Sequence, residues 1–225
     1  MISVCLIIFG EMLDTYKHKG MRRQLIEELK EKGISNPDVL AAFDKVPRHF
    51  FLDSSFTNQA YSNTAFQIGA GQTISHPFTV ALQTSLLELE RGHKVLEIGT
   101  GSGFQTSILC AMGAKVVSIE RQKELFINAK DSIEKLGYTA RLFYGDGYKG
   151  KASYAPYDSI LVTCGAPFIP EDLKKQLKIG GKLVIPIGEG KNQIMHRLTK
   201  ISDEEWETET YGVFSFVPML EKTNK

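Results

Sequence analysis

The chain of 225 residues carries 27 Lys and Arg against 26 Asp and Glu, and 42% of its residues are apolar. These values predict a soluble globular protein with a real core, and they argue against the strongly basic surface of a nucleic-acid binder. The longest apolar run, Val4 to Phe9, is too short to cross a bilayer. The three cysteines have no paired spacing that would indicate a disulfide framework or a zinc site. We therefore expect a cytoplasmic protein with no metal cofactor, no nucleic-acid partner and no membrane partner.

The N-terminal region predicts three helices and one long loop. Periodic apolar residues predict amphipathic helices over 16–32 and 37–46. The chain then has no periodicity until a third helix, predicted over 77–89. A loop of that length is usually functional or disordered. Ser75 or His76 is the predicted N-cap of the third helix, because a proline follows at its first position.

Strands and helices alternate along the second half of the chain. The predicted strands are 95–98, 115–120, 141–144, 157–163 and 182–187, and the helices between them are 105–112, 122–136 and 170–178. This alternation predicts a doubly wound α/β fold with a mostly parallel sheet and right-handed crossovers. Two more strands, 193–201 and 206–217, are expected to form an antiparallel hairpin at the edge of the sheet.

These elements also predict the domain organisation. Residues 1–20 are expected to be an N-terminal tail, and residues 21–225 a single domain, which we expect to be monomeric. Within it, 21–92 would hold the N-terminal helices and the long loop, 93–190 the cofactor-binding core, and 191–225 the C-terminal edge strands.

A glycine-rich turn follows the first strand of the alternating region. It reads Glu97-Ile-Gly-Thr-Gly-Ser-Gly103. Glycines at such a turn allow positive φ and let a ligand approach the main-chain N–H groups. A dinucleotide fingerprint would need a glycine where the chain has Phe104, which weakens the case for NAD. An acid just before the glycines suits a ligand with an ammonium and a sulfonium centre. The predicted cofactor-binding residues of this turn are Glu97, Gly99, Thr100, Gly101, Ser102 and Gly103.

Further polar residues lie where the next strands end. Glu120 is the last residue of the second strand in this region. Nucleotide-binding α/β folds place an acid at this position, where it accepts hydrogen bonds from the ribose hydroxyls. Such an acid fits NAD and S-adenosylmethionine equally well. Asp146, followed by Gly147, is placed to accept a hydrogen bond from an adenine amino group, although Asp-Gly alone would indicate a turn. Cys164, after the fourth strand, is expected to be a small apolar wall residue. We predict Glu120, Asp146 and Gly147 as cofactor-binding residues.

Two motifs carry a resemblance to known families. The acid with three alternating glycines resembles motif I of S-adenosylmethionine-dependent methyltransferases with a Rossmann-like sheet. More specifically, Ile68-Gly-x-Gly-Gln-Thr-Ile-Ser-x-Pro77 is similar to the signature of protein-L-isoaspartate (D-aspartate) O-methyltransferases. Further family-like segments are 95–103, 145–147, 176–181, 185–188 and 216–219, so the resemblance runs from about residue 21 to residue 219. Phe104 stands where the family usually has Tyr.

The resemblance implies S-adenosylmethionine as cofactor and damaged proteins or peptides as substrates. The methyl acceptor would be the free carboxylate of L-isoaspartyl and D-aspartyl residues, and its methylation would initiate repair. A carboxylate with a pKa of about 4 is already ionised at pH 7 and needs no general base. Ser75 is implied as the catalytic residue that orients this carboxylate, and capping of the third helix remains its alternative role. The implied substrate-binding residues are Ile68, Gly69, Thr73, Ser75, His76 and Val217.

Other functions are less well supported by the sequence. A methyltransferase acting on RNA or DNA commonly carries an Asn/Asp-Pro-Pro-aromatic motif after the fourth strand, where this chain has residues 163–168, Thr-Cys-Gly-Ala-Pro-Phe. A small-molecule O-methyltransferase would usually need a base or a metal, and no such cluster is evident. Phe104 argues against an NAD-dependent oxidoreductase. The presence of Glu97, Glu120, Asp146 and Ser75 argues against a binding module that keeps the fold without catalytic activity. An S-adenosylmethionine-dependent methyltransferase acting on a small molecule or RNA remains the alternative.

Overall fold

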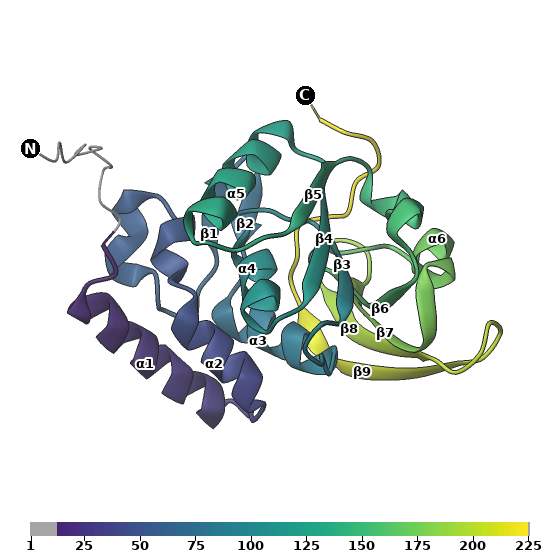
Figure 1. The fold of residues 1–225 in the computed structure, drawn as a ribbon, viewed down its shortest axis with the longest axis horizontal. Helices are drawn as coiled ribbons and strands as arrows, with labels where there is room; N and C mark the ends of the chain where they lie inside the picture. Colours follow the sequence, from purple (N-terminus) through teal and green to yellow (C-terminus); the bar gives the residue numbers. More distant parts are fainter. Residues whose placement is uncertain (1–12, 225) are drawn as a thin grey trace, which may run out of the picture.

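A seven-stranded sheet with helices on both sides forms the centre of the molecule, in a computed structural model that describes residues 13–224 (Figure 1). The strand order is β5-β4-β3-β6-β7-β8-β9. The strands are β3 (Lys94–Ile98), β4 (Lys115–Glu120), β5 (Arg141–Tyr144), β6 (Tyr157–Val162), β7 (Leu177–Ile187), β8 (Gln193–Lys200) and β9 (Trp206–Phe214). Strands β3 to β7 pair in parallel, whereas β8 and β9 pair antiparallel at the edge. The predicted doubly wound fold and its edge hairpin are confirmed.

Six α-helices surround this sheet in the described part of the chain. They are α1 (Tyr16–Glu31), α2 (Pro37–Lys45), α3 (Pro77–Leu86), α4 (Phe104–Ala111), α5 (Lys123–Lys135) and the short α6 (Glu171–Lys175). The Thr15 side chain caps α1 by accepting a hydrogen bond from the His18 N–H. Helix α1 therefore begins within the segment 1–20 that was expected to be a tail, of which residues 1–12 lie outside the described residues.

The strands build two cores because successive side chains point to opposite faces of the sheet. Leu96 and Ile160 are fully buried on the face that also packs Leu173 of α6. Val95 and Leu161 are fully buried on the other face, in a cluster with residues of α3 and α4. Burial on both faces explains the continuous apolar runs of these strands.

The long loop before α3 holds more regular structure than its sequence predicts. It contains two short 3-10 helices (Arg48–Phe51 and Ser54–Gln59) and a hairpin of β1 (Phe66–Gly69) and β2 (Gln72–Ile74). The hairpin lies beside α4 (Figure 1), and a Cβ on Gly101 would be 3.6 Å from Ile68 Cδ1. The hairpin therefore covers the glycine-rich turn.

Helix α3 is capped by a side chain from this loop. His76 occupies the N-cap position, but its side chain makes no capping hydrogen bond. Asn63 Oδ1 accepts a hydrogen bond of 2.9 Å from the Phe78 N–H instead. The predicted N-cap position is confirmed at His76, but neither Ser75 nor His76 supplies the capping hydrogen bond, because a residue 15 positions from Phe78 provides the acceptor. Ser75 is thereby left free of the cap.

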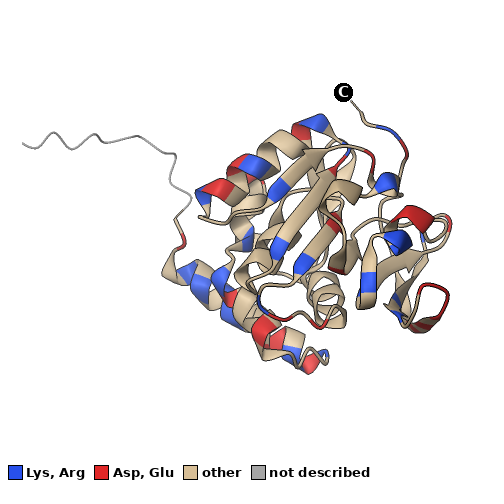
Figure 2. Ribbon diagram, turned by 45° about the vertical axis from the view of Figure 1, so that its right-hand side comes forward, with Lys and Arg blue, Asp and Glu red and all other residues tan. Residues whose placement is uncertain are grey.

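Charges of both signs are interspersed over the helices and loops (Figure 2), as the nearly equal numbers of acidic and basic residues predict. Among residues 13–224, no helix has both the length and the apolar character that crossing a membrane requires.

Candidate active site

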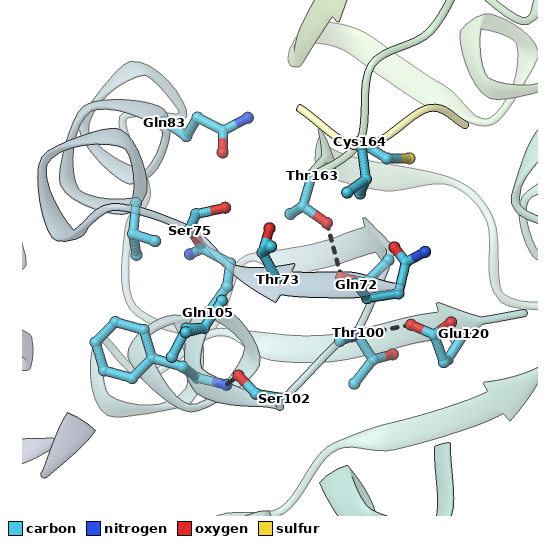
Figure 3. A pocket seen from close by; sticks show the side chains of 16 residues that line it. Gln72, Thr73, Ser75, Gln83, Thr100, Ser102, Gln105, Glu120, Thr163 and Cys164 are labelled. Atoms are coloured by element: carbon cyan, nitrogen blue, oxygen red, sulfur yellow. Dashed lines mark hydrogen bonds between the residues drawn. The ribbon is translucent and has the colours of Figure 1, made fainter. Parts of the chain in front are cut away.

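A cavity opens at the carboxyl ends of the central strands, beneath the β1–β2 hairpin (Figure 3). In open α/β sheets, ligands bind at this edge. The predicted residues that line the cavity are Thr73, Ser75, Gly99, Thr100, Gly101, Ser102, Glu120 and Val217. One cavity thus joins residues predicted for the cofactor to residues predicted for the substrate, although they lie far apart in sequence.

The glycine-rich turn has a geometry that only glycine tolerates at its first position. Gly99 has a φ of +96°, and a Cβ there would lie 2.5 Å from Thr163 Oγ1. Thr163 donates its hydroxyl to the carbonyls of Gly99, at 2.7 Å, and Ile98, at 2.9 Å. Gly103 is the N-cap of α4, also with positive φ. The first N–H groups of α4 therefore lie at the turn, where helix N-termini favour anions.

Glu120 is held by two backbone amides at the rim of the turn. Its Oε2 accepts a hydrogen bond of 2.8 Å from the Gly101 N–H, and its Oε1 accepts one of 2.8 Å from the Gln122 N–H. The residue is buried but still lines the cavity. Each carboxylate oxygen retains a lone pair, so the side chain can accept further hydrogen bonds from ligand hydroxyls.

Glu97 lies beneath the turn rather than in the cavity. Its side chain is fully buried, and its Oε2 accepts a hydrogen bond of 2.5 Å from Thr106 Oγ1 of α4. Strand alternation explains this position, because Glu97 shares the α4 face of β3 with Val95. Burial raises the pKa of the carboxyl to about 7, against the hydrogen bond from Thr106, which lowers it. The structure therefore does not bring Glu97 to the ligand side, as the sequence had suggested.

A second, smaller hollow continues from the first around Glu120. It shares Gln72, Gly99, Glu120 and Cys164 with the first cavity, and its other walls are largely apolar. Gly147 lines it, and a Cβ at that position would overlap Ile98 Cγ2. A flat, apolar ligand group fits such walls.

Asp146 stands beside this hollow without lining it. Its Oδ1 accepts a hydrogen bond of 3.0 Å from the Tyr148 N–H, and its Oδ2 accepts one of 3.0 Å from the Lys222 N–H. The carboxylate thus ties the turn after β5 to the C-terminal segment. Cys164 lines both hollows, as expected of a wall residue, and burial raises the pKa of its thiol to about 12.

Gln105 presents an unpaired acceptor to the cavity. Its Nε2 donates a hydrogen bond of 2.9 Å to Thr84 Oγ1. The Thr84 hydroxyl is itself used in a hydrogen bond of 2.7 Å to the Val80 carbonyl, so it accepts from Gln105. This fixes the orientation of the Gln105 amide and leaves its buried Oε1 without a partner among the described residues. A donor group on a ligand would satisfy that oxygen.

The hairpin is anchored by the buried guanidinium of Arg48. It donates hydrogen bonds to the carbonyls of Ala60 at 2.6 Å, Thr64 at 2.9 Å and Ser75 at 3.0 Å. Thr64 precedes β1 and Ser75 follows β2, so one side chain holds both ends of the hairpin. The backbone of Ser75 is thereby fixed at the cavity wall.

Three residues predicted for the substrate lie outside this cavity. Ile68 and Gly69 line a separate, wider depression on the other side of the hairpin, which shares Gly101 and Ser102 with the first. His76 is exposed.

Seven lining residues were not predicted as site residues: the polar Gln72, Gln83, Gln105 and Thr163, and the apolar Ile74, Val80 and Phe104. A polar Gln83 on the buried side of α3 and a Gln105 two residues after Gly103 were signals that could have indicated two of them.

One group of potential metal ligands occurs among residues 13–224, away from the cavity. Asp14, His18 and His49 bring their ligand atoms within 4.8 Å of one another. Arg22 already donates to both Asp14 oxygens, at 2.9 and 3.0 Å. A guanidinium at that distance disfavours a further cation.

The fold and the site together define a doubly wound α/β protein with a nucleotide-type ligand site at the carboxyl edge of its sheet. The profile of the protein-L-isoaspartate(D-aspartate) O-methyltransferase (PCMT) family matches residues 20–224. A protein-L-isoaspartate O-methyltransferase from Flavobacterium psychrophilum is 56% identical over 214 residues, which cover 95% of this chain and 100% of that protein. The chain therefore belongs to the protein-L-isoaspartate(D-aspartate) O-methyltransferase family.

Solved structures are similar over most of the chain. A protein-L-isoaspartate O-methyltransferase with 30% identity has a TM-score of 0.80, and the match covers 88% of this chain and 65% of that one. Another, from Plasmodium falciparum in complex with S-adenosyl-L-homocysteine, has 26% identity and a TM-score of 0.78, with 88% and 98% covered.

Proposed function

We propose that this chain transfers the methyl group of S-adenosylmethionine to the free carboxylate of L-isoaspartyl and D-aspartyl residues in damaged proteins and peptides, and so initiates their repair. The observation that carries the proposal is the cavity shared by the glycine-rich turn and Ser75 of the hairpin. Membership of the family supports the choice of acceptor.

The residues present fit S-adenosylmethionine. The turn 99–103 and the first N–H groups of α4 would hold the methionyl carboxylate, and the unpaired Gln105 Oε1 would accept from the ammonium group. Glu120 would accept from the ribose hydroxyls. When bound, the cofactor supplies a methyl group on a sulfonium centre.

The adenine would occupy the hollow lined by Gly147, with Asp146 beside it. The apolar Ile119, Pro218 and Met219 in the walls of this hollow support the assignment. In this arrangement Glu97 supports the turn from below by its bond to α4 and does not touch the ligand.

The reaction requires the protein to align the carboxylate with the methyl group, and it requires no general base. A carboxylate with a pKa of about 4 is an ionised nucleophile at pH 7, and no proton moves when it becomes a methyl ester. Ser75 would donate a hydrogen bond to one carboxylate oxygen and turn the other toward the methyl group. Enclosure beneath the hairpin removes water from the carboxylate, and both effects lower the barrier of a two-reactant step.

The peptide on either side of the acceptor would follow the hairpin. Thr73 and Val217 line the cavity beside Ser75 and would contact the acceptor residue. Ile68, Gly69 and His76 would contact flanking residues, since they lie around the hairpin but outside the cavity.

We also propose that the chain from α1 onward acts as a single, monomeric domain in the cytoplasm, on many protein substrates and without binding nucleic acid. The interspersed charges of Figure 2 and the free thiols of Cys110 and Cys164 support this proposal.

The test is transfer of labelled methyl from S-adenosylmethionine to a short isoaspartyl peptide, beside its normal aspartyl twin. We expect a base-labile methyl ester on the isoaspartyl peptide alone. Binding of S-adenosylmethionine without transfer to either peptide would discard the acceptor and direct the search to small molecules and RNA.

A further inference from the structure

Gln83 is a polar side chain on the buried face of α3. It is only 1% exposed, yet it lines the cavity that contains Ser75. Figure 3 shows it extending from its helix toward the space bounded by Ser75, Thr73 and Thr163. The buried residues of α3 around it include apolar Val80 and Leu86 as well as Thr79 and Thr84, and Gln83 carries the only amide among them.

The orientation of the Gln83 amide follows from its partners. Nε2 donates a hydrogen bond of 3.0 Å to the Val162 carbonyl and lies 3.7 Å from Met195 Sδ. A carbonyl oxygen only accepts, so the NH₂ group must face Val162 and the amide oxygen must face away from it. The hydrogen bonds of Gln83 to the described residues both use Nε2. Its Oε1 is therefore an acceptor available to a bound group.

A donor lies on the same side of the cavity as Gln83, at Ser75 just before α3 (Figure 3). The Ser75 hydroxyl is free of the α3 cap, because Asn63 performs that role. The Thr163 hydroxyl, by contrast, is already donated to the carbonyls of Ile98 and Gly99. The cavity thus presents an acceptor at Gln83 and a donor at Ser75, which matches a group that carries an N–H next to a carboxylate.

An isoaspartyl residue has this pair of groups on one carbon. Its α-carbon bears both the amide nitrogen and the free carboxylate, so standard bond lengths fix the nitrogen about 2.5 Å from the carboxylate carbon. In a normal aspartyl residue one more carbon separates the two groups. Two wall residues at fixed positions can therefore distinguish the isomers by this spacing.

We propose that Gln83 Oε1 accepts a hydrogen bond from the amide N–H of the isoaspartyl residue and thereby favours it over aspartyl residues of either hand, so that D-aspartyl residues are the weaker acceptors. This rests on the proposed function. A carboxylate is repelled by the amide oxygen, so Gln83 also directs it toward Ser75. Gln83 is a specificity-determining residue that touches the substrate, and it leaves cofactor binding unaffected.

The experiment compares an isoaspartyl peptide with its ester analogue, in which oxygen replaces the amide N–H of the isoaspartyl residue. For the wild-type enzyme we expect kcat/KM to be about tenfold lower on the ester, because one hydrogen bond is lost. In Gln83→Met, kcat/KM on the amide should fall by a similar factor, and the change to the ester should cause no further loss. The affinity for S-adenosylhomocysteine should stay unchanged.

The proposal is refuted if the ester lowers kcat/KM of Gln83→Met by the same factor as it lowers kcat/KM of the wild type. It is also refuted if the wild type methylates the amide peptide and the ester analogue at equal rates. Gln24→Met, at an exposed position of α1, is the matched control and should behave as wild type. Should Gln83→Met fail to bind S-adenosylhomocysteine, Gln83→Leu repeats the comparison, and loss of binding there too would assign Gln83 to the fold and refute the proposal. If the wild type methylates neither peptide, the proposed function fails; if it methylates both equally, only this inference fails.

Discussion

The two sides of the cavity are built in different ways. On the cofactor side, the turn 99–103 is held against the sheet, because Thr163 donates to the carbonyls of Ile98 and Gly99 and Glu120 accepts from the Gly101 N–H. On the substrate side, the hairpin is held by Arg48, whose partners lie 12 to 27 residues away in sequence. Both sides depend on contacts between segments that are distant in sequence, but the turn is tied to strands of the sheet and the hairpin is tied to the loop before α3. Variants on the cofactor side should therefore change ligand binding, and variants on the hairpin side should change turnover.

The largest effect is expected for Gly99→Ala on the cofactor side. The new Cβ would lie 2.5 Å from Thr163 Oγ1 at a φ of +96°, so the turn must move. We expect S-adenosylhomocysteine binding, measured by calorimetry, to be lost and stability to fall by about 2 kcal/mol or more. Gly20→Ala is the control, since nothing lies within 4 Å of a Cβ there and alanine favours a helix. Retained binding in Gly99→Ala would show that the turn adapts.

Ser75→Ala should separate chemistry from binding on the hairpin side. Loss of a hydrogen bond to a charged group lowers turnover by about 10- to 100-fold. The affinity for S-adenosylhomocysteine should hardly change, because Asn63, not Ser75, caps α3. Ser85→Ala on the same helix is the control, and its hydroxyl bonds only the Ala81 carbonyl. Equal losses of turnover and binding would assign Ser75 a structural role.

Arg48→Lys tests whether the hairpin must be held at both ends. Lysine keeps the charge but not the planar fork that reaches three carbonyls, so the hairpin should loosen. We expect turnover to fall by about tenfold with little change in S-adenosylhomocysteine affinity. Arg23→Lys, at an exposed site on α1, serves as control. If Arg48→Lys loses cofactor affinity but keeps its turnover at saturating S-adenosylmethionine, then the hairpin serves cofactor binding and not turnover.

The smallest effect on activity is expected for Glu97→Gln, which should change the pH dependence of stability. Burial raises the pKa of this carboxyl to about 7 from 4.5, so the folded protein keeps a proton that the unfolded chain releases. The stability contributed by this group is therefore fully present below pH 4.5 and is lost as pH rises through 7.

Urea unfolding of wild type and Glu97→Gln between pH 4.5 and pH 8 measures this effect. The free energy of unfolding of the wild type should decline relative to the variant, by up to about 3 kcal/mol across the range. Parallel pH profiles would show that Glu97 titrates as it does in the unfolded chain.

The sequence alone predicted the fold class, the edge hairpin and the positions of Glu120 and the glycine-rich turn. These depend on short-range patterns: apolar runs, alternation of strands with helices, and glycines where a strand meets a helix. The carboxyl ends of parallel strands meet at one edge, so residues just after the strands come together in any such fold. The family resemblance of residues 68–77 added the expected role of Ser75.

Only the tertiary structure decided where each side chain points. Strand alternation turned Glu97 toward α4, and a distant Asn63 took the cap that Ser75 or His76 was expected to supply. The acceptor role of Gln83 depends on the Val162 carbonyl, 79 residues away. Such contacts arise when distant segments pack together, and no local pattern encodes them. The directions in which the site side chains point are therefore set by tertiary packing and could not be predicted from the sequence.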